Sequence, residues 1–301
     1  MKFIMLNKGF QFLIVSFLGL LTNNCSNSSD KETPVLEQEI KEEIEEPKID
    51  VNATDYWDNA ELIWNDEFDG TSLSLVNWKY ETGQHGWGNN EWQNYVANDN
   101  VEVSEGTLKI NAIKVGTGQK IGDYTSARLN STQAFTFGRM EIRAKIPEDK
   151  GNGIWPALWM LGENINLVGW PTCGEIDMME YVSFDPNKVH FTIHSAANNH
   201  VDGTQATSGP VDLETIEEEF HNYGLLWTDE YLKFYIDDID NIMFTFQKPR
   251  SFNANNWPFS KPLYFLMNIA VGGNWGGLEG VDDRIFPAIM EVDYVRVYQV
   301  K

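Results

Sequence analysis

The stretch RMEIRAKIP, residues 139–147, decides the fold, because its side chains alternate between apolar and charged with a period of two. Such alternation is typical of a strand that packs one face on a core and turns the other face away from it. The segment therefore predicts a β-strand with one charged face. The two faces are Met140, Ile142, Ala144 and Ile146 against Arg139, Glu141, Arg143 and Lys145.

Further strands of the same kind follow along the chain. GTLKINAIKV (106–115) alternates in the same way, and MEVDYVRVYQV (290–300) predicts a final strand. YLKFYIDDIDNIMFTF (231–246) predicts a hairpin that turns at Asp237–Asp238. Turn residues recur about every ten positions, and no long capped helix is predicted. The fold class is therefore all-β, a sandwich of two antiparallel sheets.

Composition limits the classes of partner. The chain has 301 residues, enough for one domain of about 250 residues after its ends are removed. A net charge of −23 argues against nucleic acid and against anionic membrane surfaces as partners. The 11 tryptophans indicate either a large core or a cleft that stacks on sugars. We expect a soluble extracellular protein that is monomeric.

The N-terminal residues predict export. Lys2 and Lys8 form a basic segment before an apolar run, 10–21, which is too short to span a bilayer comfortably. Residues 1–24 are therefore interpreted as a signal peptide. Cys25 follows directly, as in bacterial lipoprotein signals, although two asparagines before it replace the usual small residues. We expect a lipid anchor on Cys25 and a cell-surface or outer-membrane lipoprotein. Ordinary cleavage, which would give a secreted protein, stays open.

The segment after the signal differs from the rest of the chain. Residues 25–52 are acidic and contain no aromatic residue, so they predict a flexible tether, and residues 53–301 form the predicted catalytic β-sandwich domain. Cys173 is the second of two cysteines. If Cys25 is lipidated or removed, no disulfide can form, and Cys173 is interpreted as a small packing residue.

The stretch CGEIDMMEYV, residues 173–182, carries three carboxylates. On a regular strand Glu175 and Asp177 share a face, and Glu180 points to the other side. A β-bulge at Met178–Met179 would add one residue and return Glu180 to the shared face. The sequence therefore predicts a bulged strand with three acids on one face. A solvent-facing acidic strand is the alternative.

Two carboxylates that face one bond suit glycoside hydrolysis. With one residue lost to a bulge, Glu175 and Glu180 behave as positions four apart, about 13 Å between Cα atoms at ~3.3 Å per residue. Side chains that lean inward can approach the ~5–5.5 Å separation of a retaining mechanism, whereas an inverting pair needs more room. Asp177 lies between them, where it can share a proton and help to keep the acid protonated.

Three tryptophans precede the acids in GNGIWPALWMLGENINLVGWPTCGEIDMMEYV (151–182). Flat indole faces stack on the apolar faces of pyranose rings, so tryptophan beside carboxylate is typical of a sugar site. Trp155 and Trp159, four apart on a strand, share a face. We expect Trp155, Trp159 and Trp170 to include sugar-stacking residues and at least one structural residue.

These motifs resemble glycoside hydrolase family sixteen in its laminarinase branch. The likeness covers residues 57–300 and rests on the E-I-D-x-x-E core and on flanking blocks in the family's order: SARLNSTQAFTFGRMEIRAKIP, WPALWMLG, FHNYGLLWTDEYLKFYIDD, MNIAVGGNWGG and MEVDYVRVYQ. The resemblance implies a β-jelly roll with a concave cleft and a retaining endo-β-1,3-glucanase. It implies Glu175 as nucleophile, Asp177 as assisting carboxylate, Glu180 as general acid/base and His194 as a catalytic histidine beside the acid/base.

The resemblance also implies contacts to sugar and a structural metal. The implied sugar contacts are Asn90, Arg128, Glu141, Arg143, Asn268 and the ring of Trp275. A structural Ca²⁺ on the convex side is implied, held mainly by backbone carbonyls and one carboxylate, at Glu67, Gly106 and Asp293. Catalysis needs no cofactor, because the carboxylates supply both the nucleophile and the proton.

The expected partner is a laminarin-type β-glucan. Two alternatives stay open. The same retaining mechanism could act on mixed-linkage β-1,3-1,4-glucan or on a marine galactan, as an agarase does. The chain could instead be a non-catalytic glycan-binding module, although a binding module has no need for three converging acids.

Overall fold

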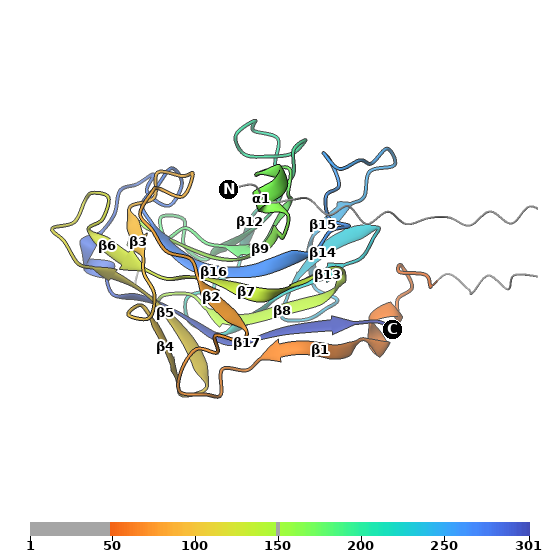
Figure 1. Cartoon of the computed structure of the whole chain (residues 1–301), viewed down its shortest axis with the longest axis horizontal. Helices are drawn as coiled ribbons and strands as arrows, with labels where there is room; N and C mark the ends of the chain where they lie inside the picture. The colour runs from red at the N-terminus through yellow and green to blue at the C-terminus, as the bar shows by residue number, and fades with distance from the viewer. Residues whose placement is uncertain (1–48, 149–150) are drawn as a thin grey trace, which may run out of the picture. The chain divides into compact units, whose positions relative to one another are not determined.

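The computed structural model describes residues 49–148 and 151–301 (Figure 1). The predicted signal peptide, Cys25 and nearly all of the predicted tether lie outside these residues, so they stay predictions. Within the described part, no helix has the length and apolar character needed to cross a membrane.

Strands of the described chain form two sheets (Figure 1). The larger sheet has ten strands. Its main path runs in the order β15 (Ile242–Gln247), β14 (Tyr231–Ile236), β13 (His221–Trp227), β8 (Gly138–Lys145), β17 (Ala288–Gln299), β5 (Thr107–Lys114), β6 (Tyr124–Ser126) and β3 (Gln93–Tyr95). Two further strands pair beside this path, β1 (Glu61–Asp66) with β17 and β4 (Val101–Ser104) with β5.

The smaller sheet has seven strands and carries the predicted catalytic segment. Its order is β12 (Ala206–Asp212), β11 (Lys188–His194), β10 (Glu175–Glu180), β9 (Ile154–Gly162), β16 (Leu263–Val271), β7 (Arg128–Phe135) and β2 (Trp78–Tyr80). Strand neighbours in both sheets are antiparallel except β3 and β6, which run parallel. The predicted all-β sandwich is confirmed, with this one parallel pair as a difference.

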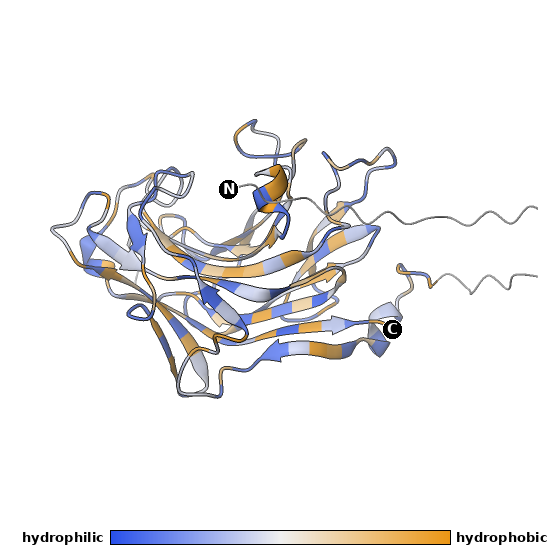
Figure 2. Cartoon of the chain, viewed as in Figure 1, coloured by the Kyte–Doolittle hydropathy of each residue, from blue (hydrophilic) through white to orange (hydrophobic). Residues whose placement is uncertain are grey.

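The core between the sheets follows from strand alternation. Met140, Ile142 and Ala144 of β8 are fully buried in the same cluster as Ile176 and Met178 of β10. Hydrophobic and hydrophilic segments alternate along the strands in Figure 2. Each strand of a two-layer sandwich must bury one face, so a period of two fixes which residues enter the core.

Helical structure in the described residues is short. It consists of α1 (Ile165–Val168) and two 3₁₀ turns, η1 (Tyr56–Asn59) and η2 (Asp283–Ile285). The predicted hairpin is confirmed by the antiparallel pairing of β14 with β15. Its turn begins at Asp237, which has a left-handed φ of 63° that aspartate tolerates better than most residues.

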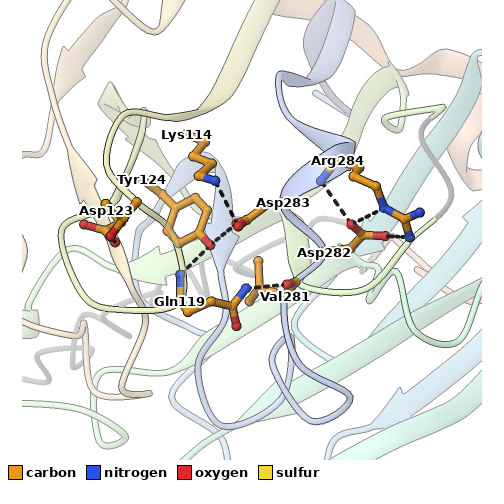
Figure 3. A network of polar contacts seen from close by, with 9 residues as sticks. Lys114, Gln119, Asp123, Tyr124, Val281, Asp282, Asp283 and Arg284 are labelled. Carbon is orange, nitrogen blue, oxygen red and sulfur yellow. Dashed lines mark hydrogen bonds and ion pairs between the residues drawn. The ribbon is translucent and has the colours of Figure 1, made fainter.

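Polar contacts join η2 to the residues at the two ends of the loop 115–123, between β5 and β6 (Figure 3). Asp283 accepts hydrogen bonds from the Tyr124 hydroxyl at 2.7 Å and from Lys114 Nζ at 2.9 Å. The backbone N–H of Gln119 donates to the Tyr124 hydroxyl oxygen at 3.0 Å. Because β6 pairs with β3, these contacts also hold the strand that brings Tyr95 to the site described next.

Candidate active site

The predicted bulge is present in β10. Glu175 pairs with Leu161 of β9 and Glu180 pairs with Ala157, so five steps along β10 match four along β9. The shift in register falls between Asp177 and Met179. A regular strand would turn Glu180 toward the core, so the extra residue returns it to the face of the other two acids.

Burial shows how the two faces of β10 are used. Ile176, Met178 and Met179 are fully buried in the core between the sheets. The three acids line the opposite face, which is the floor of a cleft of about 730 Å³. The alternative of a solvent-facing acidic strand is therefore wrong, because Asp177 is 3% and Glu180 8% exposed.

The cleft collects most of the predicted site residues from several strands. Trp155 and Trp159 both face it from β9, as their spacing predicts. The predicted residues that line it are Arg128, Trp155, Trp159, Trp170, Glu175, Asp177, Glu180 and Asn268. These residues come from β7, β9, β10, β16 and the loop before β10, so the sheet brings together positions far apart in the sequence.

Two indole N–H groups hold the two glutamates. Trp155 Nε1 donates to Glu180 Oε1 at 3.1 Å, and Trp170 Nε1 donates to Glu175 Oε2 at 3.1 Å. The sequence predicted these rings as sugar-stacking surfaces and missed the hydrogen bonds. Each ring therefore orients a carboxylate through its N–H and also lines the cleft.

Burial raises the pKa of all three carboxyls. Desolvation is the main cause for each. The pKa of Glu175 rises to about 8, where repulsion by Glu180 adds to burial and the positive charge of Arg128 opposes them. The pKa of Glu180 rises to about 7, and that of Asp177 well above its ordinary value. Near neutral pH the cluster therefore shares protons, which is the state that an acid and a nucleophile side by side require.

His194 lies beside the acids, opposite Glu175 on the neighbouring strand β11, and is not among the residues that line the cleft. Its Nε2 is 3.4 Å from Asp177 Oδ2 and 3.7 Å from Glu175 Oε1. Burial is the main cause that lowers the pKa of His194 to about 3, so the ring is neutral at pH 7. Asp177 Oδ2 and His194 Nδ1 are buried without a hydrogen-bond partner among the described residues.

A chain of hydrogen bonds fixes the wall formed by β9 and β16. Trp159 Nε1 donates to Asn268 Oδ1 at 2.8 Å, and Asn268 Nδ2 donates to the Tyr95 hydroxyl oxygen at 3.1 Å. The Tyr95 hydroxyl in turn donates to Glu91 Oε2, to which Gln93 Nε2 donates at 2.6 Å. The buried Glu91 carboxylate thus terminates a chain that sets the orientation of the Trp159 ring.

Arg128 connects this wall to the neighbouring loop. Its guanidinium lies over the rings of Trp87 and Trp159, at 4.8 and 4.6 Å from their centroids, and its Nε donates to Glu81 at 2.6 Å. Cation–π contacts on two rings and a carboxylate partner restrict this long side chain to one position. The same positive charge favours the ionised form of Glu175.

Two further predicted contacts do not reach the cleft. Trp275 packs against Trp155 in a T-shaped arrangement, with ring centroids 5.2 Å apart. Asn90 is exposed and donates to Asn274 at 2.8 Å. Neither side chain is among the residues that line the cleft, and their contacts to sugar stay a prediction.

Glu141 and Arg143 lie on the other sheet, so the expectation that they contact sugar in this cleft is wrong. Glu141 is buried and accepts a hydrogen bond from the Tyr235 hydroxyl at 2.5 Å. Arg143 pairs with Asp293 at 2.5 Å. Alternation placed both residues on the polar face of β8, but that face lies away from the inter-sheet core and from the seven-stranded sheet.

The predicted calcium positions meet beside β17. Strand β1 pairs with β17 up to Asp66–Val295, and β5 pairs with it from Leu108–Val292, so Glu67 and Gly106 approach Asp293 from the two ends of a gap. The carboxylates there already have partners, because Arg143 binds Asp293 and Arg296 binds Glu67. The one predicted carboxylate ligand, that of Asp293, is bound to Arg143, and the calcium site stays a prediction.

Sequence reasoning missed several residues of the cleft. These are Glu81, Trp87, His200 and Tyr264 in its lining and Tyr95 behind it. Glu91, the residue after the predicted Asn90, also lines it. The dense polar and aromatic run GNNEWQNYV (88–96) was the one signal that pointed to Tyr95 and Glu91. The others sit in loops and strand ends whose positions depend on long-range pairing.

Comparisons with known proteins agree with this geometry. The family model described as glycosyl hydrolases family 16 matches residues 88–296. A β-glucanase of Rhodothermus marinus is 43% identical over 250 residues, covering 79% of this chain and 85% of the relative. The crystal structure of a laminarinase from Flavobacterium sp. UMI-01 aligns with a TM-score of 0.72 at 41% identity, covering 79% of this chain and all of that one. The structure of SCLam, a non-specific endo-β-1,3(4)-glucanase, aligns with a TM-score of 0.73 at 38% identity, covering 81% and 92%.

Proposed function

Because the chain belongs to the glycosyl hydrolases of family 16, we propose that it is a retaining endo-β-1,3-glucanase that cleaves laminarin-type β-glucans. The observation that carries the proposal is the bulged strand β10, which places Glu175, Asp177 and Glu180 on one face of an aromatic-walled cleft. The β-glucanase and laminarinase relatives support the choice of substrate.

The mechanism assigns one glutamate to each side of the scissile bond. Protonated Glu180 donates its proton to the leaving oxygen while the Glu175 carboxylate attacks the anomeric carbon, and a glycosyl-enzyme forms. Glu180, now ionised, takes a proton from water, and the resulting attack releases the sugar and restores Glu175. Burial raises the pKa of Glu175 at least as far as that of Glu180, so the pKa values do not distinguish the nucleophile from the acid, and the two roles are assigned by their positions in the E-I-D-x-x-E motif. The positive charge of Arg128 favours the ionised Glu175 that the attack requires.

Asp177 and His194 act through the nucleophile. Asp177 is buried between the glutamates, and repulsion by both of them adds to burial in raising its pKa. A protonated Asp177 can give a hydrogen bond to a neighbouring carboxylate and orient it. Neutral His194 offers polar contact at 3.4–3.7 Å without adding a positive charge that would trap the cluster in its fully ionised form.

Product analysis on laminarin tests the proposal. We expect internal cleavage, seen as a fall in polymer length before small sugars accumulate, and β-configured products in the first minutes by proton NMR. Glu175→Gln should lower kcat by at least about 10³-fold while the fold and sugar binding remain. Products of inverted configuration, or a Glu175→Gln variant that keeps most of its activity, would refute the assignment.

A mixed-linkage β-1,3-1,4-glucan is the second candidate substrate, favoured by the likeness to the non-specific SCLam. Comparing kcat/KM on pure laminarin and on mixed-linkage glucan decides between the two. A sulfated galactan fits this cleft less well, because the cleft holds the carboxylates of Glu81 and Glu91 in addition to the three acids of β10.

The location and the metal of the protein are further parts of the proposal. The basic and apolar start of the sequence and Cys25 support export and a lipid anchor. Metabolic labelling with a palmitate analogue tests the anchor, and Cys25→Ala is the control that should not be labelled.

A structural Ca²⁺ would be held by the backbones of Glu67 and Gly106 and by Asp293, and it would have to displace Arg143 from that carboxylate. A chelator that lowers Tm, with recovery on adding Ca²⁺, would support such a site.

A further inference from the structure

We propose that Glu175, Asp177 and His194 form a binding site for Zn²⁺ that excludes the glucan from the catalytic centre. One ligand atom from each of these residues lies within 4.8 Å of the other two. The three side chains combine two carboxylate oxygens with one imidazole nitrogen. Zinc takes such mixed oxygen and nitrogen ligands, at about 2.0–2.2 Å from each.

The measured separations match the coordination geometry. In a tetrahedron with bonds of that length, two ligand atoms are about 3.3–3.6 Å apart. His194 Nε2 lies 3.4 Å from Asp177 Oδ2 and 3.7 Å from Glu175 Oε1. The two carboxylate oxygens lie within 4.8 Å of each other, so a cation could enter between the three atoms if the carboxylates close around it by up to about 1 Å through side-chain rotation.

The polar atoms of the cluster have room for such a partner. Asp177 is 3% exposed, and its Oδ2, which faces His194 Nε2, has no hydrogen-bond partner among the described residues. A buried acceptor without a donor is costly, and a divalent cation would satisfy it. Glu175 and Asp177 also line the cleft, so the fourth position of the ion opens to solvent.

The second nitrogen of His194 limits the affinity. Histidine ligands usually donate their other N–H to a carboxylate or carbonyl, which orients the ring and strengthens the bond to the metal. His194 Nδ1 is buried and has no such partner among the described residues. We therefore expect reversible, micromolar binding rather than a permanently held ion. Ca²⁺ and Mg²⁺ prefer all-oxygen sites and should compete poorly.

Direct binding tests the site without relying on hydrolysis. The purified full-length protein, stripped of metals with a chelator, is titrated with zinc sulfate against a chromophoric zinc indicator. We expect one equivalent of zinc bound in the micromolar range, and at least a tenfold weaker affinity in Asp177→Asn and His194→Gln. His200→Gln is the matched control: this histidine also lines the cleft, with its ring 5.2 Å from that of His194, but it is not part of the ligand set. It should bind zinc within about twofold of the parent protein.

Two results would overturn the site: unchanged zinc affinity in His194→Gln, or an equal loss in His200→Gln. Each variant is checked for its thermal transition. If the variants do not fold, crystals of the parent protein soaked in zinc sulfate decide, because an anomalous peak away from Asp177 and His194 refutes the proposal.

The inhibitory consequence rests on the proposed function. Zinc should inhibit laminarin hydrolysis competitively and reversibly, since it occupies the carboxylate that must attack the sugar. Zinc binding without inhibition would refute this competition. Zinc binding by a protein that never hydrolyses laminarin would instead refute the glucanase assignment and leave the metal site in place.

Discussion

Carboxylates at the two sheets have different partners. Next to the ten-stranded sheet, Glu67 follows the end of β1 and accepts hydrogen bonds from the Arg296 guanidinium at 2.7 and 2.9 Å, which lower the pKa of that carboxyl. On the seven-stranded sheet Glu175 and Glu180 accept from neutral indole N–H groups, and burial raises the pKa of both. A neutral donor fixes the position of a carboxylate while leaving its charge free to change. The first arrangement suits structure and the second suits proton transfer.

The largest expected effect comes from removing an acid at each sheet. Glu180→Gln keeps the size of the side chain but cannot donate and accept a proton, so kcat should fall by about 10²–10⁴-fold. Glu67→Gln is the matched control beside the other sheet and should keep kcat within about twofold. Steady-state assays on laminarin measure both. A comparable loss in Glu67→Gln would show that the two sheets are not functionally separate.

A smaller effect is expected from changing the neutral donor. Trp155→Phe removes the N–H that stabilises ionised Glu180, so the pKa of that carboxyl should rise above about 7. The alkaline limb of kcat/KM against pH should then move to higher pH, and kcat should fall about tenfold. Trp159→Phe, which loses a hydrogen bond to Asn268 rather than to a carboxylate, should leave the limb in place. An unshifted limb in Trp155→Phe contradicts the role of the indole.

The free energy of unfolding should decrease as pH rises, because burial in the cleft raises the pKa of Glu175 and Glu180. The folded protein keeps protons on Glu175 and Glu180 up to about pH 8 and 7, whereas an unfolded carboxyl releases its proton near 4.5. Unfolding therefore releases protons between these values, and the free energy of unfolding falls as pH rises from about 4.5 to 8. Glu175→Gln should be more stable than the parent at pH 8.

Thermal melts at two pH values measure this difference. At pH 8 the Tm of Glu175→Gln should exceed that of the parent by a few degrees, at about 2–4 °C for each kcal/mol in a domain of this size. At pH 4 the difference should vanish, since both carboxyls are then protonated in the folded and unfolded states. A lower Tm for Glu175→Gln at pH 8 would mean that the carboxylate is stabilised rather than strained in the cleft.

The smallest effect is expected from the charge pairs of the ten-stranded sheet. Arg143 and Asp293 are each more than a third exposed, so their attraction is screened by water. Arg143→Gln should change the free energy of unfolding by no more than about 1 kcal/mol and leave laminarin hydrolysis unchanged. Urea denaturation and the standard assay test this. A large loss of activity would restore the family-based expectation that Arg143 belongs to the sugar site.

The sequence predicted features that depend on local geometry and missed features that depend on contacts between distant segments. Alternation in RMEIRAKIP identified a strand and its core face, and the spacing of Glu175 and Glu180 required the bulge that β10 contains. Both inferences need only local geometry. Alternation identifies the polar face of β8 but not the sheet to which β8 belongs. The expectation that Glu141 and Arg143 contact sugar in the cleft was therefore wrong.

Long-range pairing explains what remained hidden. The chain from Trp159 through Asn268 and Tyr95 to Glu91 joins segments more than 170 residues apart, and the parallel pairing of β3 with β6 places one end of it. No periodicity within a segment reports such a contact. The hydrogen bonds of the two indole groups were missed for a different reason, because composition shows that a ring is near the acids but not which way its edge points.

The two methionines of β10 determine which face of the strand carries Glu180, because one of them is the extra residue of the bulge. Deleting either Met178 or Met179 would leave every acid in the sequence, yet the remaining strand could pair without interruption and swing the last glutamate between the sheets. Such a chain would carry all the chemical groups of a hydrolase while being unable to bring them to one sugar. The number of residues between the two glutamates is therefore as much a part of this active site as their identity.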